Sequence, residues 1–177
     1  NGFFVRGLSR LPPSVPQHWT NKYKHHSVDF RTSKSTLCAL VSGASCVFHC
    51  AGHYDAEPYL LEQYIASVSN LAVASKQSGV NHFILISTLA VYGAGVEGTY
   101  SVDSRPNPST TYGMSRFRAE NALNEIFACS KVAVSVIRIP AVVGVEMKSK
   151  VLSGLFRMIS MGFFFHPGGH NSSFACI

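Results

Sequence analysis

Tyr112 and Arg116 are the side chains whose types and spacing could perform chemistry. They stand four positions apart, so a helix would place them on one face, where a positive charge lies beside a phenol. A phenol normally titrates at about 10, and a neighbouring cation favours its anionic form. Such a pair could exchange a proton with a substrate hydroxyl near neutral pH. Taken alone, Tyr112 is more simply explained as an amphipathic core tyrosine.

The segments around this pair alternate between two patterns. Short apolar runs bounded by turn residues predict strands, and apolar residues at helical spacing predict helices. Continuous apolar strands suit a parallel sheet covered on both faces, as in right-handed βαβ units. The sequence therefore predicts an α/β fold with a mainly parallel sheet. We expect strands within residues 2–10, 26–30, 46–50, 82–87 and 132–139, helices within 35–40, 60–77, 112–127 and 151–161, and mainly loop over 11–27.

The composition narrows the range of partners. Hydrophobic residues make up 46% of the 177 residues and charged residues 14%, which argues against a disordered chain. No apolar run approaches the roughly 18 residues of a membrane span, and the basic residues behind the net charge of +6 are scattered. We therefore expect a soluble, cytoplasmic protein without a membrane or nucleic-acid partner, whose mild basicity suits a phosphate-rich ligand. The 5 cysteines show no metal-ligand spacing, so we expect reduced thiols and no metal site.

Several motifs around Tyr112 occur in the order of a known family. Thr88 and a Val-Tyr-Gly at 91–93 follow the strand expected at 82–87, and Asp103 with two prolines precedes Tyr112. Further matches are Asp29-Phe30, Val47 to Gly52, Arg138-Ile139-Pro140, Val143-Gly144 and the segment 168–177. With these motifs the chain resembles the extended short-chain dehydrogenase/reductase superfamily, in particular its NAD(P)-dependent epimerase/dehydratase family. The resemblance covers almost the whole chain and implies a Rossmann-like, doubly wound, mainly parallel sheet.

The resemblance also implies roles for individual residues. Tyr112 corresponds to the family's acid/base tyrosine, Arg116 to the lysine that supports it and binds the nicotinamide ribose, and Thr88 to a residue hydrogen-bonded at the reacting oxygen. The hydride chemistry belongs to the cofactor. The implied cofactor-binding residues are Ser9, Arg10, Asp29, Phe30, Cys50, Ala51, Gly52, Gln63, Tyr112, Arg116 and Pro140.

The strand end at Ser9 bears on the choice of cofactor. NAD users of the family normally carry an acid there, whereas this chain has Ser9 followed by Arg10. An acid repels a 2′-phosphate, while serine and arginine can bind one through charge-assisted hydrogen bonds. We therefore expect a preference for NADP over NAD.

The chain departs from the family pattern in both architecture and site. No G-x-x-G-x-x-G occurs, so the fold should lack its first βα unit, whose central strand would otherwise pair with its neighbours. The chain also stops where the family continues with helices that close the substrate site. Arg116 replaces the usual lysine, and Tyr64 stands where family members often have asparagine, with Gln63 beside it as an alternative amide. We expect residues 1–177 to form one incomplete NAD(P)-binding domain, with the start of the substrate-binding part at about 144–177.

Three functions remain open on the sequence. The leading one is a nucleotide-sugar epimerase, dehydratase or reductase that transfers hydride, and a homodimer is a further expectation. The second is a reductase or dehydrogenase of a hydrophobic, sterol-like alcohol or ketone, which the aromatic run Phe163-Phe164-Phe165 would suit. The third is a non-catalytic binding protein that retains the fold, which Arg116 and the absent glycine motif favour.

Overall fold

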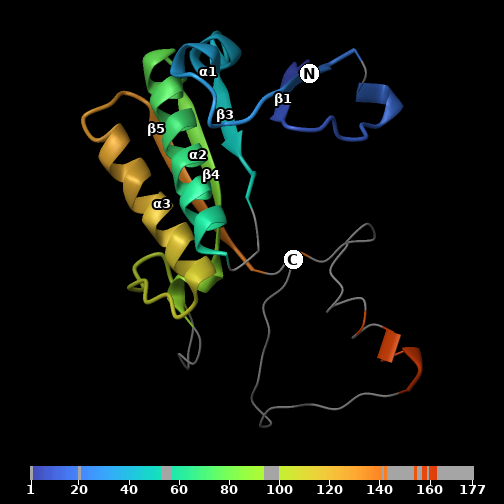
Figure 1. Ribbon diagram of the computed structural model, residues 1–177, viewed down its shortest axis with the longest axis vertical. Coiled ribbons are helices and arrows are strands. Elements are labelled where there is room, and N and C mark those ends of the chain that lie inside the picture. The colour runs from blue at the N-terminus through green and yellow to red at the C-terminus, as the bar shows by residue number, and fades with distance from the viewer. Residues whose placement is uncertain are drawn as a thin grey trace. The chain divides into compact units, whose positions relative to one another are not determined.

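The computed structural model describes residues 2–19, 21–52, 57–93, 100–140, 142, 154, 157–158 and 160–162 (Figure 1). The chain divides into two compact units, Asn1–Arg138 and Ile139–Ile177, and the first carries nearly all of the described structure. The helix expected at 151–161 lies mostly outside the described residues, and a substrate-binding part from about residue 144 stays a prediction. The elements, in order, are β1 (Val5–Ser9), the 3-10 helix η1 (Gln17–Trp19), β2 (Tyr23–Ser27), α1 (Lys34–Val41), β3 (Cys46–His49), α2 (Pro58–Gln77), β4 (His82–Thr88), the 3-10 helix η2 (Leu89–Tyr92), α3 (Thr111–Phe127) and β5 (Ala133–Ile139).

The described strands form two separate sheets. β1 pairs in parallel with β2, and β3, β4 and β5 follow one another in the second sheet. β3 and β4 are parallel, with Cys46 opposite His82 and His49 opposite Leu85. In a doubly wound sheet of order 3-2-1-4-5-6, these are the places of strands 3-2 and 4-5-6, and no described residue fills the place of strand 1. The structure thus confirms a Rossmann-like, mainly parallel fold, in which the described residues form no first βα unit.

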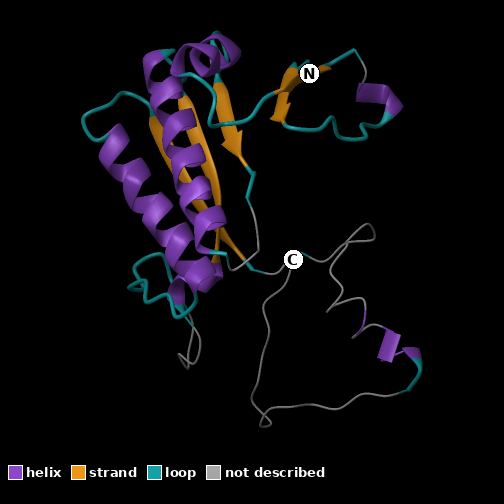
Figure 2. Ribbon diagram, viewed as in Figure 1, coloured by secondary structure: helices purple, strands orange, loops and turns teal. Residues whose placement is uncertain are grey.

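α2 and α3 lie side by side over one face of the sheet β3–β4–β5 (Figure 2). Because side chains alternate along a strand, Val47, Phe83 and Leu85 share one face, where they join the buried core. On the opposite face Phe48 in β3 is 63% exposed and Ile137 in β5 is 43% exposed, whereas Ile84 in β4 is 9% exposed. The two helices therefore pack against the strands from one side.

β2 differs from the sequence expectation. We expected a strand within 26–30 after a loop, whereas the strand is Tyr23–Ser27. Each residue of β1 pairs with one residue of β2, and Val28 then donates its N–H to the Ser9 carbonyl at 3.1 Å. The parallel partner supplies hydrogen bonds that the mostly polar local sequence does not signal. Asp29 and Phe30 therefore lie just beyond the carboxyl end of the strand.

Candidate cofactor-binding and active site

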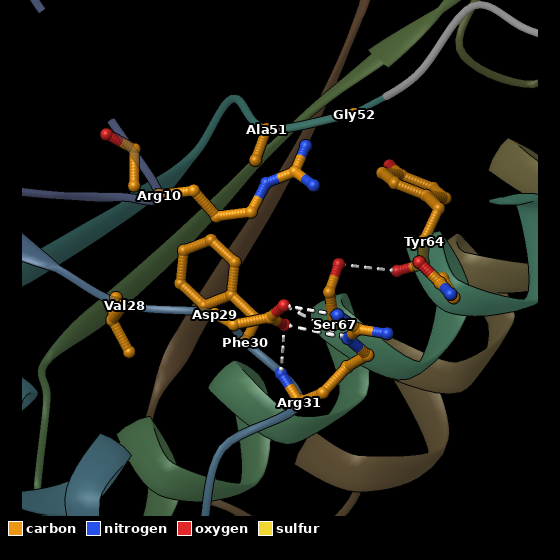
Figure 3. Close-up of a pocket in the computed structure, with 11 residues that line it drawn as sticks. Arg10, Val28, Asp29, Phe30, Arg31, Ala51, Gly52, Tyr64 and Ser67 are labelled. Carbon is orange, nitrogen blue, oxygen red and sulfur yellow. Dashed lines mark hydrogen bonds and ion pairs between the residues drawn. The ribbon is translucent and has the colours of Figure 1, made fainter. Parts of the chain in front are cut away.

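A cavity of about 280 Å³ lies at the carboxyl ends of β1, β2 and β3 (Figure 3). In open α/β sheets this is the edge at which ligands bind. Seven residues that the sequence assigned to cofactor binding line it, namely Ser9, Arg10, Asp29, Phe30, Ala51, Gly52 and Gln63. Val28, Arg31, Tyr64 and Ser67 complete its wall, and Cys50, Tyr112, Arg116 and Pro140 are not part of that wall.

Two guanidinium groups stand at this cavity. Arg31 donates from Nε and Nη2 to the carboxylate of Asp29 at 2.5 to 3.1 Å, and its backbone N–H donates to the same group at 2.9 Å. These hydrogen bonds hold the pKa of Asp29 well below its usual range, and the charge of Arg10 acts in the same direction. Figure 3 shows the Arg10 side chain reaching across the cavity toward Ala51. The cavity therefore combines a neutralised carboxylate with a second cation, which suits an anionic ligand.

Ser9 has a partner that the sequence did not indicate. Its hydroxyl donates to the Leu11 carbonyl at 2.7 Å and lies 3.0 Å from Nε2 of His25. His25 is half-buried on the neighbouring strand. The register of two parallel strands brings them together, and one sequence alone does not reveal that register.

A close backbone approach brings together the elements that carry Thr88 and Tyr112. Thr88 ends β4, and its hydroxyl accepts a hydrogen bond from the N–H of Ala90 in η2 at 3.2 Å. Thr110 caps α3 by accepting from the N–H of Gly113 at 3.0 Å. A Cβ on Gly113 would lie 2.4 Å from the Ala90 carbonyl oxygen, so only glycine lets α3 approach η2 this closely. The first turn of α3, with Tyr112, is therefore fixed beside the end of β4.

Arg116 links Tyr112 to the wall of the cavity. It is 7% exposed, and its Cζ lies 3.6 Å from the ring centroid of Tyr64 and 4.8 Å from that of Tyr112. A Cβ on Gly52 would lie 2.3 Å from Nη2 of Arg116, so the guanidinium edge meets the main chain after β3. Burial raises the pKa of Tyr64, while the charge of Arg116 opposes that shift. The cation expected to serve Tyr112 thus also touches two residues of the cavity wall.

His49 is buried beside this cluster. It is 2% exposed, and its ring centroid lies 5.9 Å from that of Phe30 and 5.9 Å from that of Tyr64. Neither ring nitrogen has a hydrogen-bond partner among the described residues. Burial, reinforced by the charge of Arg116, lowers the pKa of His49 to about 4. The imidazole is therefore neutral at physiological pH and acts as an aromatic packing group.

Acidification should destabilise the protein through His49. The unfolded chain binds a proton on this residue below about 6.5, whereas the folded one does so only below about 4. Between these values the unfolded state binds more protons, so stability is lost as pH falls through the window, by about 3 kcal/mol in all. Urea unfolding at several pH values measures this loss. His49→Leu should flatten the slope, the exposed His18→Asn should not, and equal slopes in all three proteins would contradict the assignment.

The sequence reasoning missed a buried ionic network around Glu120 of α3, one helical turn after Arg116. Glu120 is 3% exposed and accepts from Ser87 at 2.5 Å and from Nη2 of Arg138 at 2.7 Å. Arg138 also donates to the hydroxyl of Tyr92 at 2.8 Å, and that hydroxyl donates to the Ser101 carbonyl at 3.0 Å. The hydrogen bond from Arg138 to Glu120 raises the pKa of the guanidinium. The network ties β4, η2, α3 and β5 together directly behind Thr88. A carboxylate on the apolar face of a helical pattern was the available signal.

The structure adds no metal site or membrane-spanning helix within the described residues, and several of the remaining motifs lie outside them. Within the described residues, no three or more His, Cys, Asp or Glu side chains gather as a metal site. No helix in that part of the chain is long and apolar enough to cross a bilayer. Pro140 follows β5 in the second unit, and the motifs at 143–144, 163–165 and 168–177 lie outside the described residues.

Comparisons with known proteins agree with the fold and the motifs. A model of the NAD-dependent epimerase/dehydratase family matches residues 1–163. The UDP-glucose 4-epimerase of Vibrio cholerae is 32% identical over 132 residues, which are 69% of this chain and 40% of that protein. The solved structure of MoeE5 in complex with UDP-glucuronic acid and NAD has a TM-score of 0.76 and 25% identity, over 89% of this chain and 53% of that chain. The UDP-glucuronic acid 4-epimerase of Bacillus cereus in complex with NAD has a TM-score of 0.74 over 89% of this chain and 55% of that one; at 19% identity it shows the fold alone.

These matches extend over most of this chain but over only part of each relative. The chain spans 40% of the Vibrio cholerae enzyme and 53–55% of the solved chains. The family match nevertheless covers the strands, the helices and the tyrosine motif on which the resemblance rests. The chain therefore belongs to the NAD-dependent epimerase/dehydratase family, within the extended short-chain dehydrogenases/reductases.

Proposed function

We propose that the protein containing this chain binds NADP(H) and acts on a nucleotide sugar, as an epimerase, dehydratase or reductase that uses Tyr112 as acid/base. The observation that carries the proposal is the place of Arg116, whose guanidinium contacts the Tyr112 ring on one side and cavity-wall residues on the other. A proton-exchanging group and the ligand cavity are thereby joined by one buried cation.

The residues of the cavity fit a dinucleotide of this kind. Asp29 and Phe30 would flank the adenosine end, the main chain at Ala51 and Gly52 would pass along the cofactor, and Arg116 would hold a ribose hydroxyl. When bound, the nicotinamide supplies hydride transfer. Burial of Arg116 gives its charge a strong effect on neighbouring groups, because the local dielectric is low.

The chain's own residues would manage the proton. The Tyr112 phenolate oxygen would take the proton of a substrate hydroxyl as that oxygen becomes a carbonyl, and the resulting hydroxyl would return it in the reverse step. The hydroxyl of Thr88 would hydrogen-bond to the same substrate oxygen and orient it. The capped start of α3 and the contact of Gly113 with η2 hold the two groups on fixed main chain, so little reorganisation is needed.

The substrate class rests on relatives. The similar proteins are a UDP-glucose 4-epimerase and MoeE5 solved with UDP-glucuronic acid, and both act on or bind a nucleotide sugar by name. Turnover assays with UDP-glucose, UDP-galactose and UDP-glucuronic acid test the class. Residues from about 144 onward would begin the part that binds the sugar. Cofactor binding without turnover of any nucleotide sugar or apolar ketone would favour a non-catalytic binding protein.

Cofactor titration should show tighter binding of NADPH than of NADH, by about tenfold to a hundredfold, the effect of a charge-assisted hydrogen bond to the extra phosphate. Arg10 reaches over the cavity and Ser9 lies at the same strand end, so both can meet a 2′-phosphate. Fluorescence titration of the two reduced cofactors measures the ratio. Arg10→Ala should remove most of it, whereas the exposed Lys131→Ala should not. Tighter binding of NADH by the unchanged protein would refute the NADP preference.

A further inference from the structure

Arg116 is held between the rings of two tyrosines. Its Cζ lies 3.6 Å from the centroid of Tyr64 on α2 and 4.8 Å from that of Tyr112 on α3. Arg116 is 7% exposed and Tyr64 is 3% exposed, so the contact is shielded from water. Cation–π contacts gain strength when they are desolvated, and the shorter of these distances belongs to Tyr64. Tyr64 is therefore the closer aromatic contact of the guanidinium.

Further residues fix Tyr64 and the guanidinium in turn. The His49 ring packs edge-on against Tyr64 at 5.9 Å and an interplanar angle of 74°, and Phe30 follows at 5.9 Å from His49. On the remaining side, a Cβ on Gly52 would lie 2.3 to 2.8 Å from Nη2, Nη1 and Cζ of Arg116. A series of contacts thus leads from Phe30 in the cavity wall through the rings of His49 and Tyr64 to the guanidinium of Arg116, which in turn contacts the ring of Tyr112.

The pairing of residue types at positions 64 and 116 has a physical reason. A guanidinium is planar, so it can lay its face on a ring while its edge N–H groups stay available for hydrogen bonds. An ammonium is a compact charge and offers no flat face. We propose that Tyr64 is a positioning residue, whose ring clamps the face of Arg116 and so fixes the cation beside Tyr112 and the cavity wall. The proposal deepens the proposed function and rests on it for its effect on turnover.

The clamp itself is measured without any turnover, through the side-chain Nε–H signal of Arg116 in NMR spectra of the full chain. Ring currents of Tyr64 should displace this signal, and Tyr64→Leu should return it toward the position of an unstacked arginine. Tyr64→Phe keeps the ring and should leave the signal displaced. Arg118, on the same helix and paired with Glu62, is the internal control whose signal should not move. An Arg116 signal that is unchanged in Tyr64→Leu overturns the proposal.

The effect on turnover is tested by a double-mutant cycle in the protein that contains this chain. Tyr64→Leu should lower kcat by roughly 2- to 30-fold, the equivalent of a cation–π contact, with the substrate KM nearly unchanged. Tyr64→Phe should restore kcat. In the Arg116→Gln background Tyr64→Leu should add almost nothing, because the cation that it clamps is gone. Equal losses in both backgrounds would mean that Tyr64 only packs the core, and would overturn the proposal.

Two further experiments distinguish a failure of the clamp from a folding defect and from a failure of the proposed function. If Tyr64→Leu does not fold, Tyr64→Met takes its place, because methionine fills irregular core space without a ring. The Arg116 signal should again move toward the position of an unstacked arginine, and an unmoved signal overturns the clamp. If Tyr112→Phe keeps full turnover, the proposed function fails, whereas the clamp still stands or falls on the Arg116 signal.

Discussion

Tyr112→Phe should lower turnover by about 10²–10⁴-fold or more, while NADPH binding stays within a few-fold of the unchanged protein. The substitution removes the one hydroxyl that would exchange a proton with the substrate. The ring that faces Arg116 is kept, so the packing between α3 and the cavity wall is preserved. Steady-state kinetics with the substrate found by the nucleotide-sugar assays, together with cofactor titration, separate the two effects.

The control for this prediction is Tyr100→Phe. Tyr100 stacks on Tyr92 at 4.6 Å, and phenylalanine retains that stack, so turnover should be unaffected. Full turnover in Tyr112→Phe would remove the acid/base role of the tyrosine. The function left standing would then be a non-catalytic protein that binds the dinucleotide.

Glu120→Ala should lower the free energy of unfolding by about 3–5 kcal/mol, because it strands the guanidinium of Arg138 without its buried partner. The Arg138 side chain is 22% exposed and that of Glu120 is 4% exposed, so water compensates little of the lost contact. Ser87 would lose its acceptor as well. Chemical denaturation followed by circular dichroism measures the change.

Two further variants serve as comparisons for Glu120→Ala. Glu125→Ala removes a carboxylate from the exposed side of the same helix and should change stability by less than about 0.5 kcal/mol. Glu120→Gln keeps a hydrogen-bonding group, so its loss in the free energy of unfolding should lie between those of Glu125→Ala and Glu120→Ala. A loss in Glu120→Ala as small as that in Glu125→Ala would show that the ion pair contributes nothing to folding.

Local patterns predicted the core elements well, and long-range pairing explains the main error. The buried run at 82–87 and the helical period at 112–127 agree with β4 and α3 within one residue at each end. Both elements depend on local signals, namely the spacing of apolar residues and, for α3, a capping residue directly before the helix. β2 was placed too late. Its residues Tyr23 to Ser27 become a strand by pairing with β1, which lies 18 residues earlier in the chain and outside the local sequence pattern.

The residues of the candidate site likewise fall into those that local motifs indicate and those that only tertiary packing brings together. Residues at strand ends, such as Asp29 and Gly52, were predicted to bind the cofactor from the family motifs; the structure places them in the cavity wall, and their role stays a prediction. The stack of Tyr64 on Arg116, the pair of Ser9 and His25, and the network of Glu120 were not found. Each of these joins side chains from different elements, so its geometry exists only after helices and strands have packed.

The cavity takes its wall from both sheets of the first unit. β1 and β2 reach the rest of the first unit through few hydrogen bonds, among them those from Arg6 to the carbonyls of Leu40 and Ser42 at 2.9 and 2.8 Å. Segments of a protein that share few contacts can open locally, each with its own free energy. The cavity takes Phe30 from one sheet and Gly52 from the other, so a ligand seated there contacts both. The free energy of binding would then oppose the local opening of either sheet. A bound dinucleotide would thus make the sheet β1–β2 and the sheet β3–β4–β5 unfold in one transition.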